Sequence, residues 1–277
     1  MSIVAVGECT RDRYAALGVE RVGGISLNFA VHARGCGAPN VALVTCAGTD
    51  GWGPAVRSAL ARSGVDSSHV HTREGATASQ LIELDTDGER RFPPGGYNPG
   101  VLSAFALDRG DLAFIGEHDV VAAPYFRQVA HLFHPAMEAA RPGARRVVDL
   151  LDGEDLGPDL AGIDAVLDVA DLAFISSGES AVERLASRSL HARALIVVTH
   201  GARGCSALVA GRRLFEPAVP VPAHEQVDTT GCGDAFQAAF TVAWTAGAPI
   251  QNALRAGAQR AAHVVRYLGA IPIAGPL

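Results

Sequence analysis

The stretch Val227-Asp228-Thr229-Thr230-Gly231-Cys232-Gly233-Asp234-Ala235-Phe236 decides how this chain of 277 residues is interpreted. Two threonines and two glycines precede a carboxylate, and the residues from Ala235 to Trp244 favour a helix. A loop that leads into a helix N-terminus gathers free backbone N–H groups and the positive end of the helix dipole, so it can seat an anion. Asp234 would stand beside that seat, in the first turn. Phosphoryl transfer to an alcohol needs at least a bound phosphate and a nearby carboxylate that can accept the alcohol proton. The structural alternative is a glycine-rich turn in which Asp234 only caps the helix.

The composition permits one large domain and excludes several ways of handling phosphate. With 48% hydrophobic residues, the chain can bury a single full core. It contains no lysine, so all 23 of its basic residues are arginines. P-loop NTPases, protein kinases and Schiff-base enzymes each require a lysine. If this protein transfers phosphate, it must use backbone amides, arginine and a metal ion.

Charge and hydropathy indicate small-molecule partners in the cytoplasm. The net charge of −6, without any basic run, argues against a nucleic-acid partner. No apolar run is long enough to span a membrane, and residues 1–6 are predicted to be a buried strand, not a signal peptide. The five cysteines lack metal-type spacing and indicate isolated thiols in a reducing cytosol.

Short apolar runs alternate with helix-patterned segments along the whole chain. The predicted strands are 3–6, 41–46, 120–123, 147–150, 172–175, 194–199 and 206–209. The predicted helices are 27–34, 53–63, 124–137, 179–188, 234–246 and 249–268. Apolar strands separated by helices predict a mostly parallel sheet covered on both faces, which is a three-layer αβα sandwich. Ligands are then expected beyond the carboxyl ends of the strands.

Two segments do not follow this alternation of apolar strands and helices. Residues 9–22 are short and charged, and residues 76–99 alternate polar and apolar side chains before a turn-rich end. Alternation is typical of half-exposed strands, so the two segments are predicted to form a small sheet that projects from the main body. An ordinary surface hairpin is the alternative.

The run from Asp228 to Phe236 resembles the C-terminal signature of the ribokinase-like (PfkB) carbohydrate kinases, with Cys232 where alanine is usual. The resemblance implies a single kinase domain over residues 1–277, with a β lid made by residues 9–22 and 76–99. It also implies that Asp234 takes the proton of a sugar hydroxyl that attacks ATP. The N–H groups of Gly231, Cys232 and Gly233 would stabilise charge on the transferred group.

The N-terminal part resembles the same family independently. Gly7-Glu8-Cys9-Thr10-Arg11-Asp12 is similar to a Gly-Asp-x-x-x-Asp pattern whose second aspartate, here Asp12, binds sugar hydroxyls. The run from Gly23 to Ala30 is similar to Gly-Gly-x-x-x-Asn-x-Ala. This implies that Gly23, Gly24 and Asn28 bind the sugar, since glycine permits close approach and an amide both donates and accepts. Taken alone, Asp12 and Asn28 could be a loop charge and a helix-terminus residue.

The nucleotide side is implied by Val-Thr-x-Gly-x-x-Gly at residues 198–204. In the family, Thr199, Gly201 and Gly204 would lie near the ATP phosphates and ribose. Asp228 and Thr230 would position the phosphate loop on this side. In some relatives the region of Asp228 also lines a monovalent-cation site, and the sequence leaves open whether one exists here.

The metal site shows the largest departure from the family pattern. Relatives usually have Asn-x-x-Glu at a strand end, where it organises Mg²⁺ and its waters; here Ser176 replaces the asparagine and Glu179 is retained. Mg²⁺ keeps several waters and often contacts few carboxylates, so Glu179 alone could serve. Glu179 could equally interact with the helix dipole.

Within the family, the chain is most similar to fructoselysine 6-kinases, in its compact length, its short segment between Asp12 and Gly23, and residues 64–72. The function implied is ATP-dependent phosphorylation of a primary hydroxyl of a sugar or sugar derivative, with fructoselysine or another fructosamine as the specific lead. The alternatives are a kinase for an unmodified ketose, aldose or nucleoside, and a catalytically weak sugar sensor. Lid strands of the family often pair between subunits, which makes a homodimer the expected assembly.

Overall fold

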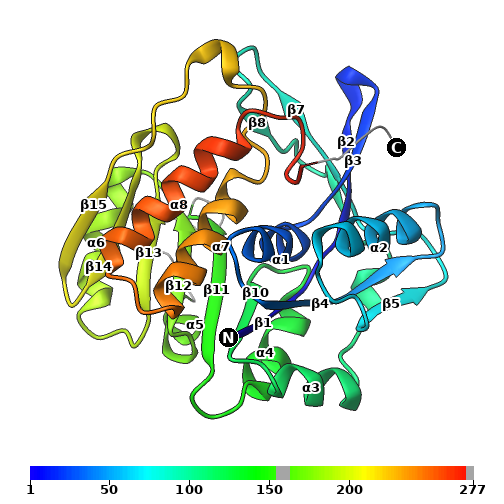
Figure 1. The fold of residues 1–277 in the computed structure, drawn as a ribbon, viewed down its shortest axis with the longest axis horizontal. Coiled ribbons are helices and arrows are strands. Elements are labelled where there is room, and N and C mark those ends of the chain that lie inside the picture. The colour runs from blue at the N-terminus through cyan, green and yellow to red at the C-terminus, as the bar shows by residue number, and fades with distance from the viewer. Residues whose placement is uncertain (154–162, 273–277) are drawn as a thin grey trace.

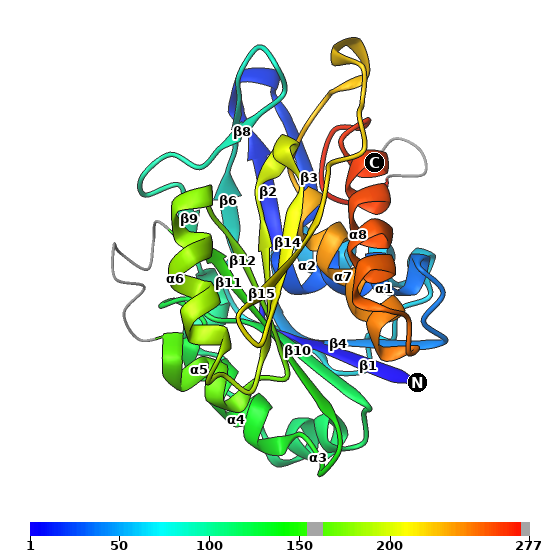
Figure 2. The same ribbon diagram turned by 90° about the vertical axis from the view of Figure 1, so that its left-hand side faces the viewer.

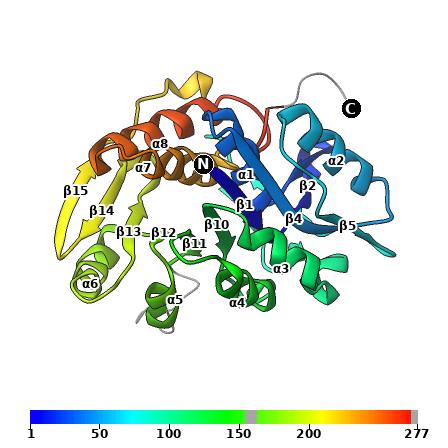
Figure 3. The same cartoon turned by 60° about the horizontal axis from the view of Figure 1, so that its bottom comes forward.

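The computed structural model describes residues 1–153 and 163–272, and these form three layers (Figure 1). Figure 3 shows a twisted sheet between two groups of helices. One face carries α1 (Ile25–Gly35), α2 (Trp52–Ser63), α7 (Cys232–Thr245) and α8 (Ile250–Val264). The other face carries α3 (Arg109–Gly116), α4 (Ala130–Ala139), α5 (Ile163–Val169) and α6 (Glu179–Ser189). The predicted three-layer α/β sandwich is confirmed.

The main sheet has nine strands, and the strands from β13 to β5 are parallel. Its order is β15 (Arg212–Glu216), β14 (Cys205–Val209), β13 (Leu195–Thr199), β12 (Leu172–Ser176), β11 (Arg145–Asp152), β10 (Val120–Pro124), β1 (Ser2–Val6), β4 (Asn40–Gly48) and β5 (Val70–Arg73). At one edge, β14 and β15 are antiparallel. The polar strand β15 was not predicted because its side chains are mostly exposed and its sequence lacks an apolar run.

The strand pattern explains why the sheet is covered on both sides. In β1, Ile3 and Ala5 belong to the core beneath α1 and α7, whereas Val4 and Val6 belong to the core on the opposite face. Successive side chains of a strand point to opposite faces, so an unbroken apolar run needs a helical layer on each side. No helix in the described part of the chain is long and apolar enough to cross a membrane.

A second, four-stranded sheet rises from the carboxyl-end side of the main sheet (Figure 2). Its order is β3 (Val19–Gly23), β2 (Thr10–Tyr14), β6 (Ser79–Leu81) and β9 (Tyr97–Asn98), and a separate hairpin pairs β7 (Glu83–Leu84) with β8 (Arg90–Arg91). The small sheet predicted from residues 9–22 and 76–99 is therefore present. That this sheet closes over a ligand is still a prediction.

The predicted start of one helix was wrong. The sequence predicted a helix over residues 124–137, but β10 continues to Pro124, which pairs with Asp149 of β11, and α4 begins only at Ala130. The Tyr125 amide extends this strand pairing by donating to the Asp149 carbonyl. Pairing with a neighbouring strand thus overrides the local helix signal. The short helices α3 and α5 were also missed.

The loop formed by residues 227–231 leads into α7 as predicted from the sequence. Gly231 lies just before the helix in the left-handed conformation, with φ of 78°, and Asp234 is in the first turn. A Cβ atom on Gly231 would also lie 2.4 Å from the Ala270 side chain. Glycine is therefore required at this position for both conformation and space.

The packing of α7 against α8 generates a prediction about stability. A Cβ atom on Gly257 of α8 would lie 2.6 Å from the buried Phe236 ring of α7. Gly257→Ala should therefore destabilise the fold by about 1–3 kcal/mol in urea unfolding, because overpacking forces the helices apart. Gly51→Ala is the matched control, since its Cβ meets open space at an ordinary φ of −60°. Equal stabilities for the two variants would contradict this account of the helix packing.

Candidate active site

The first turns of α1 and α7 meet at Asn28 and Asp234. The Asn28 Nδ2 group donates to Asp234 Oδ2 over 2.8 Å. Asn28 is buried, and its Oδ1 atom has no hydrogen-bond partner among the residues that the structure describes. An unpaired buried acceptor costs about 1–3 kcal/mol, so a ligand hydroxyl that donates to it would gain affinity. The pair thus offers adjacent acceptors to the hydroxyl groups of a ligand.

The environment of Asp234 suits a proton acceptor. Burial raises the pKa of Asp234 to about 7, and the charges of Asp149 and Glu8 also raise it. The hydrogen bond from Asn28 and the charge of Arg90 act in the opposite direction. A carboxylate whose pKa is near neutrality is a stronger base than an ordinary aspartate and is still substantially ionised at pH 7.

Asp12 lies in β2, directly against β3. The Thr10 hydroxyl donates to Asp12 Oδ1 over 2.6 Å, and a Cβ atom on Gly23 would lie only 1.9 Å from Asp12 Oδ2. Gly24, with φ of 105°, has a similar role, because its Cβ would meet the Cys9 backbone at 2.8 Å. The two glycines therefore make room for Asp12 and for the loop after β1. Whether they also contact a sugar is still a prediction.

Burial raises the pKa of Asp12 to about 7, and the charges of Glu8, Asp234 and Asp228 raise it further. These electrostatic interactions place the carboxylates of β2, the β1 end and α7 in one neighbourhood. The structure therefore brings together the N-terminal and C-terminal residues that the sequence predicted on the sugar side.

Two side chains of this neighbourhood were not assigned a role from the sequence. Glu8, just after β1, is buried and accepts a hydrogen bond of 2.6 Å from the Tyr97 hydroxyl of β9. Burial raises the pKa of Glu8, and the hydrogen bonds from Tyr97 and the Ile25 amide lower it. This contact links the second sheet to the end of β1. A tyrosine in a turn-rich segment carries no local signal for such a contact.

Asp149 is the other missed carboxylate. It lies within the apolar stretch of β11, and Leu151, in a left-handed conformation with φ of 56°, donates its amide to Asp149 Oδ1 over 2.9 Å. Burial raises the pKa of Asp149, whereas a hydrogen bond from Gln237 and the charge of Arg90 lower it. A carboxylate inside an apolar strand was a usable sequence signal, because burying a charged group is costly unless it has partners.

Asp228 holds the phosphate-loop candidate in place. Its carboxylate is fully buried and accepts from the Tyr14 hydroxyl (2.6 Å), the Thr230 amide (2.8 Å) and the Gly269 amide (2.8 Å). These contacts tie the loop to β2 and to the chain after α8. Asp228 therefore has a positioning role in this structure. Thr230 lies two residues further along, and its side chain is buried.

The β7–β8 hairpin lies directly on the same loop. The Thr229 amide donates to the Gly88 carbonyl over 3.0 Å, and the Arg90 amide donates to the Thr229 hydroxyl over 2.9 Å. Gly88 permits this approach, since a Cβ there would lie 2.8 Å from the Val227 carbonyl oxygen. The Arg90 guanidinium also donates to the Thr229 carbonyl over 3.3 Å. A cation from the hairpin thus lies beside the loop.

One of the three predicted donors of the anion seat, the Cys232 amide, makes a hydrogen bond within the loop. The Cys232 amide donates to the Thr229 carbonyl over 3.2 Å, so it is already engaged. The Gly233 and Asp234 amides lie in the first turn of α7, where no helical carbonyl can accept from them. Burial raises the pKa of the Cys232 thiol to about 12, so this side chain is a neutral thiol near neutral pH.

The predicted nucleotide side is formed by neighbouring strand ends. Thr199 ends β13 and pairs with Ser176, the last residue of β12. Gly201 and Gly204 shape the next turn with φ of 58° and 112°, and Gly204 has no room for a Cβ, which would lie 2.3 Å from the Glu216 carbonyl oxygen. The glycines are thus explained by the turn itself. A role in nucleotide binding is consistent with this position and is still a prediction.

Glu179 begins α6, immediately after the end of β12. Both of its carboxylate oxygens pair with the Arg213 guanidinium, whose Nη2 is 3.1 Å from Oε2. The hydrogen bond from Arg213 lowers the pKa of Glu179, so the carboxylate is ionised at neutral pH. Each oxygen retains a lone pair, so hydrated Mg²⁺ fits here through its waters without displacing Arg213.

The fold and these strand ends define a small-molecule kinase: a helix N-terminus that can seat phosphate adjoins a carboxylate of raised pKa. Residues 2–130 and 158–274 match the pfkB family carbohydrate kinase family. The chain is 32% identical to fructoselysine 6-kinase of Escherichia coli K12, over 97% of this chain and 99% of that protein. The chain therefore belongs to the pfkB family of carbohydrate kinases. It is an ATP-dependent enzyme that transfers a phosphoryl group to a sugar hydroxyl.

Two further similarities show how widely this fold is used. The chain is 28% identical to 2-dehydro-3-deoxygluconokinase of Escherichia coli, over 97% of this chain and 96% of that protein. A solved structure from Escherichia coli, described as ribokinase II in complex with ATP and Mg²⁺, superposes with a TM-score of 0.80 and 20% identity. The superposed region covers 97% of this chain and 94% of the chain in the solved structure. The second comparison shows the shared fold.

The raised pKa of Asp12 predicts a pH-dependent stability. In the folded state its pKa is about 7 against about 4 in an unfolded chain, so its favourable contribution is full below pH 4 and is lost as the pH rises through 7. Asp12→Asn should therefore have a higher Tm than the wild type at pH 8, by several degrees, and a Tm near that of the wild type at pH 4. Thermal unfolding at both pH values measures the difference. Asp87→Asn, in the exposed β7–β8 turn, is the control and should show no such trend. A difference that does not depend on pH would contradict the prediction.

Proposed function

We propose that this kinase phosphorylates a fructosamine, a ketose whose first carbon bears a protonated secondary amine, with fructoselysine as the reference substrate. The observation that carries the proposal is the gathering of three buried carboxylates, Glu8, Asp12 and Asp149, around the partly buried Asp234. A cationic ligand would relieve their mutual repulsion, whereas an anionic sugar acid would add to it. The 32% identity to a fructoselysine 6-kinase supports the same substrate class.

In the proposed reaction, Asp234 accepts the proton of the sugar primary hydroxyl as that oxygen attacks the γ-phosphorus of ATP. The bond from the γ-phosphorus to the β,γ-bridging oxygen breaks, and ADP leaves. Asn28 would orient the hydroxyl, and the Gly233 and Asp234 amides, together with any donor that the Gly231–Cys232 segment provides, would stabilise charge on the transferred group. Asp12 and the backbone at Gly23 and Gly24 would bind the other hydroxyls.

On the nucleotide side, Thr199, Gly201 and Gly204 would contact ATP, and Asp228 and Thr230 would hold the loop in register. Mg²⁺, when bound to the nucleotide, neutralises phosphate charge. Glu179 would hold its waters. Arg90 would provide the side-chain cation that a chain without lysine requires near the phosphates.

The role of Asp234 predicts both a rate loss and a pH profile. Asp234→Asn keeps an oxygen for the Asn28 amide but cannot accept a proton, so kcat should fall about 10²–10⁴-fold while sugar affinity changes little. In the wild type, kcat/KM should rise with pH through about 7 and level off above it, because only the ionised carboxylate acts as a base. Steady-state kinetics and equilibrium sugar binding test this. Asp87→Asn repeats the chemical change at an exposed site and should leave both unchanged. Full turnover by Asp234→Asn would refute the assignment.

The substrate class is tested by coupled ADP-release assays with fructoselysine, fructose, ribose, adenosine and 2-dehydro-3-deoxygluconate. The highest kcat/KM is expected for fructoselysine and the lowest for the sugar acid. Glu8→Gln keeps an oxygen for Tyr97 and removes one charge, so it should reduce the preference for fructoselysine over fructose about tenfold, the ratio that ~1.4 kcal/mol gives. A preference for the sugar acid, or turnover of fructose or a nucleoside above fructoselysine, would overturn the fructosamine assignment. Sugar binding without turnover of any acceptor would favour a sensor.

The finer points of the proposal concern assembly and ions. A homodimer would pair the second sheets of two subunits and so cover their exposed edges. A monovalent cation would bind near the loop at Asp228. The net charge of −6 supports small-molecule partners over nucleic acid, and the use of ATP supports a cytoplasmic location.

A further inference from the structure

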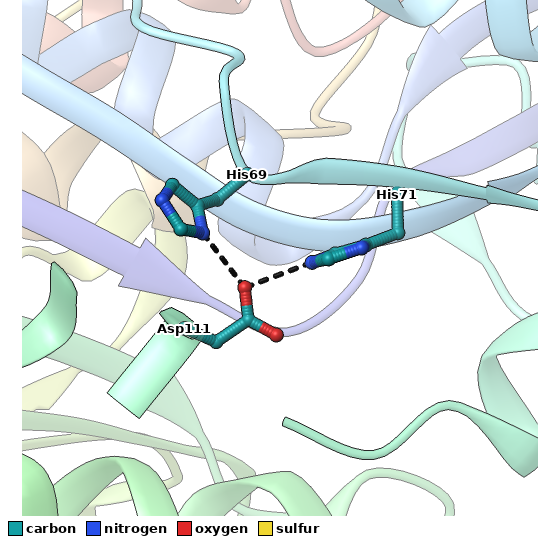
Figure 4. Close-up of side chains that lie close together, drawn as sticks. All are labelled: His69, His71 and Asp111. Atoms are coloured by element: carbon teal, nitrogen blue, oxygen red, sulfur yellow. Dashed lines mark hydrogen bonds and ion pairs between the residues drawn. The ribbon is translucent and has the colours of Figure 1, made fainter. Parts of the chain in front are cut away.

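A second cluster of potential metal-binding side chains lies outside the candidate active site. His69 precedes β5, His71 lies in β5, and Asp111 lies in the first turn of α3 (Figure 4). His69 Nδ1 is 2.7 Å and His71 Nε2 is 2.8 Å from the same atom, Asp111 Oδ1. All three ligand atoms lie within 4.8 Å of one another. The catalytic proposal uses none of them.

The surroundings hold these three groups in a fixed arrangement. Asp111 is fully buried, and its second oxygen, Oδ2, accepts from the Asp108 amide over 3.0 Å in a reciprocal capping interaction. The His69 ring stacks on Phe114 with a centroid separation of 4.0 Å, and the His71 ring packs on Phe105 at 5.1 Å. An outer hydrogen bond to the carboxylate and aromatic packing of the imidazoles are the supports that metal ligands usually have.

The cluster is also accessible. The side chains of His69 and His71 are 24% and 34% exposed, which opens the cluster to ions from solvent. The nearby arginines of this region are directed elsewhere: Arg73 donates to the Ala104 carbonyl, and Arg57 donates to the Val70 carbonyl and the Thr72 hydroxyl.

We propose that His69, His71 and Asp111 form a structural site for a divalent transition-metal ion, with Zn²⁺ as the reference ion. Two imidazoles and one carboxylate suit Zn²⁺, whereas Mg²⁺ and Ca²⁺ prefer sites made of oxygen ligands. In a tetrahedral zinc site, with ligand bonds near 2.0–2.2 Å, the ligand atoms lie about 3.3 Å apart. The two imidazoles thus need to move away from Asp111 Oδ1 by about 0.5 Å. The nitrogen of each ring that binds the ion must be unprotonated, so the proton lies on the other nitrogen, Nε2 of His69 and Nδ1 of His71. Water would take the fourth position.

Such an ion would connect the edge strand β5 to α3. Figure 3 shows α3 on the face opposite α1 and α2, beside the sheet edge where β5 lies. The chain after β5 continues directly into β6 of the second sheet. The inference concerns the stability of this edge and does not depend on which sugar the kinase phosphorylates.

The test is zinc titration of the chelator-treated full chain by isothermal calorimetry, with thermal unfolding as a second readout. One Zn²⁺ per chain should bind, and saturation should raise the Tm, because the ion binds the folded state. His69→Asn and His71→Gln each keep an N–H near the original donor position but lose the imidazole ligand. Each should weaken zinc affinity by at least about tenfold and reduce the rise in Tm. His224→Gln, at an 82% exposed position, should bind zinc as the wild type does.

Two results would overturn the proposal. One is the absence of 1:1 zinc binding in the wild type. The other is a zinc affinity that is unchanged in both His69→Asn and His71→Gln. That result would show that the ion binds elsewhere, for example at the carboxylates of the candidate active site. Circular dichroism verifies that each variant is folded, and if one variant fails to fold, the other decides. A tetrahedral Co²⁺ spectrum in the wild type that is lost in the folded variant would support the site independently.

Discussion

The hydrogen bond from Asn28 to Asp234 joins residues that are 206 positions apart and fixes the first turns of α1 and α7 against each other. The two polar groups lie at the ends of helices whose residues Phe29 and Phe236 pack in the same apolar core. Because an unpaired polar group is costly in such a place, the relative position of the two helices is narrowly determined. The β1 end, β2 and the loop before α7 all converge on this pair. The geometry of the candidate active site therefore depends on how two helices of the same layer, α1 and α7, pack against each other.

Burial of the carboxylates has an electrostatic cost. It raises the pKa of Glu8, Asp12, Asp149 and Asp234, and repulsion between carboxylates adds to the effect at Glu8, Asp12 and Asp234, so the fold is less stable at this site at neutral pH than it could be. Function and stability conflict in this way at many active sites. Here the conflict is balanced by Asn28, Tyr97 and Gln237, which donate hydrogen bonds to three of the four groups.

Much of this could be predicted from the sequence, for identifiable reasons. The apolar strands and the loop before Asp234 are local signals, because chain direction and backbone conformation follow from a few neighbouring residues. Asp12 and Asn28 were predicted as sugar-side residues only because their motifs resemble the family, and the structure places both near Asp234. The contacts of Tyr97 with Glu8 and of Arg213 with Glu179 could not be predicted, because each joins segments whose relative placement depends on the whole fold. The wrong start of the helix at Pro124 has the same origin.

The hydrogen bonds between the β7–β8 hairpin and Thr229 have a thermodynamic consequence. The Gly88 carbonyl accepts from the Thr229 amide and the Arg90 amide donates to the Thr229 hydroxyl, so the hairpin is attached to the loop that leads into α7. If binding on the proposed sugar side moves the hairpin, it also alters affinity on the proposed phosphate side, and the reverse effect has the same magnitude. Movement of the hairpin would then couple the two binding equilibria.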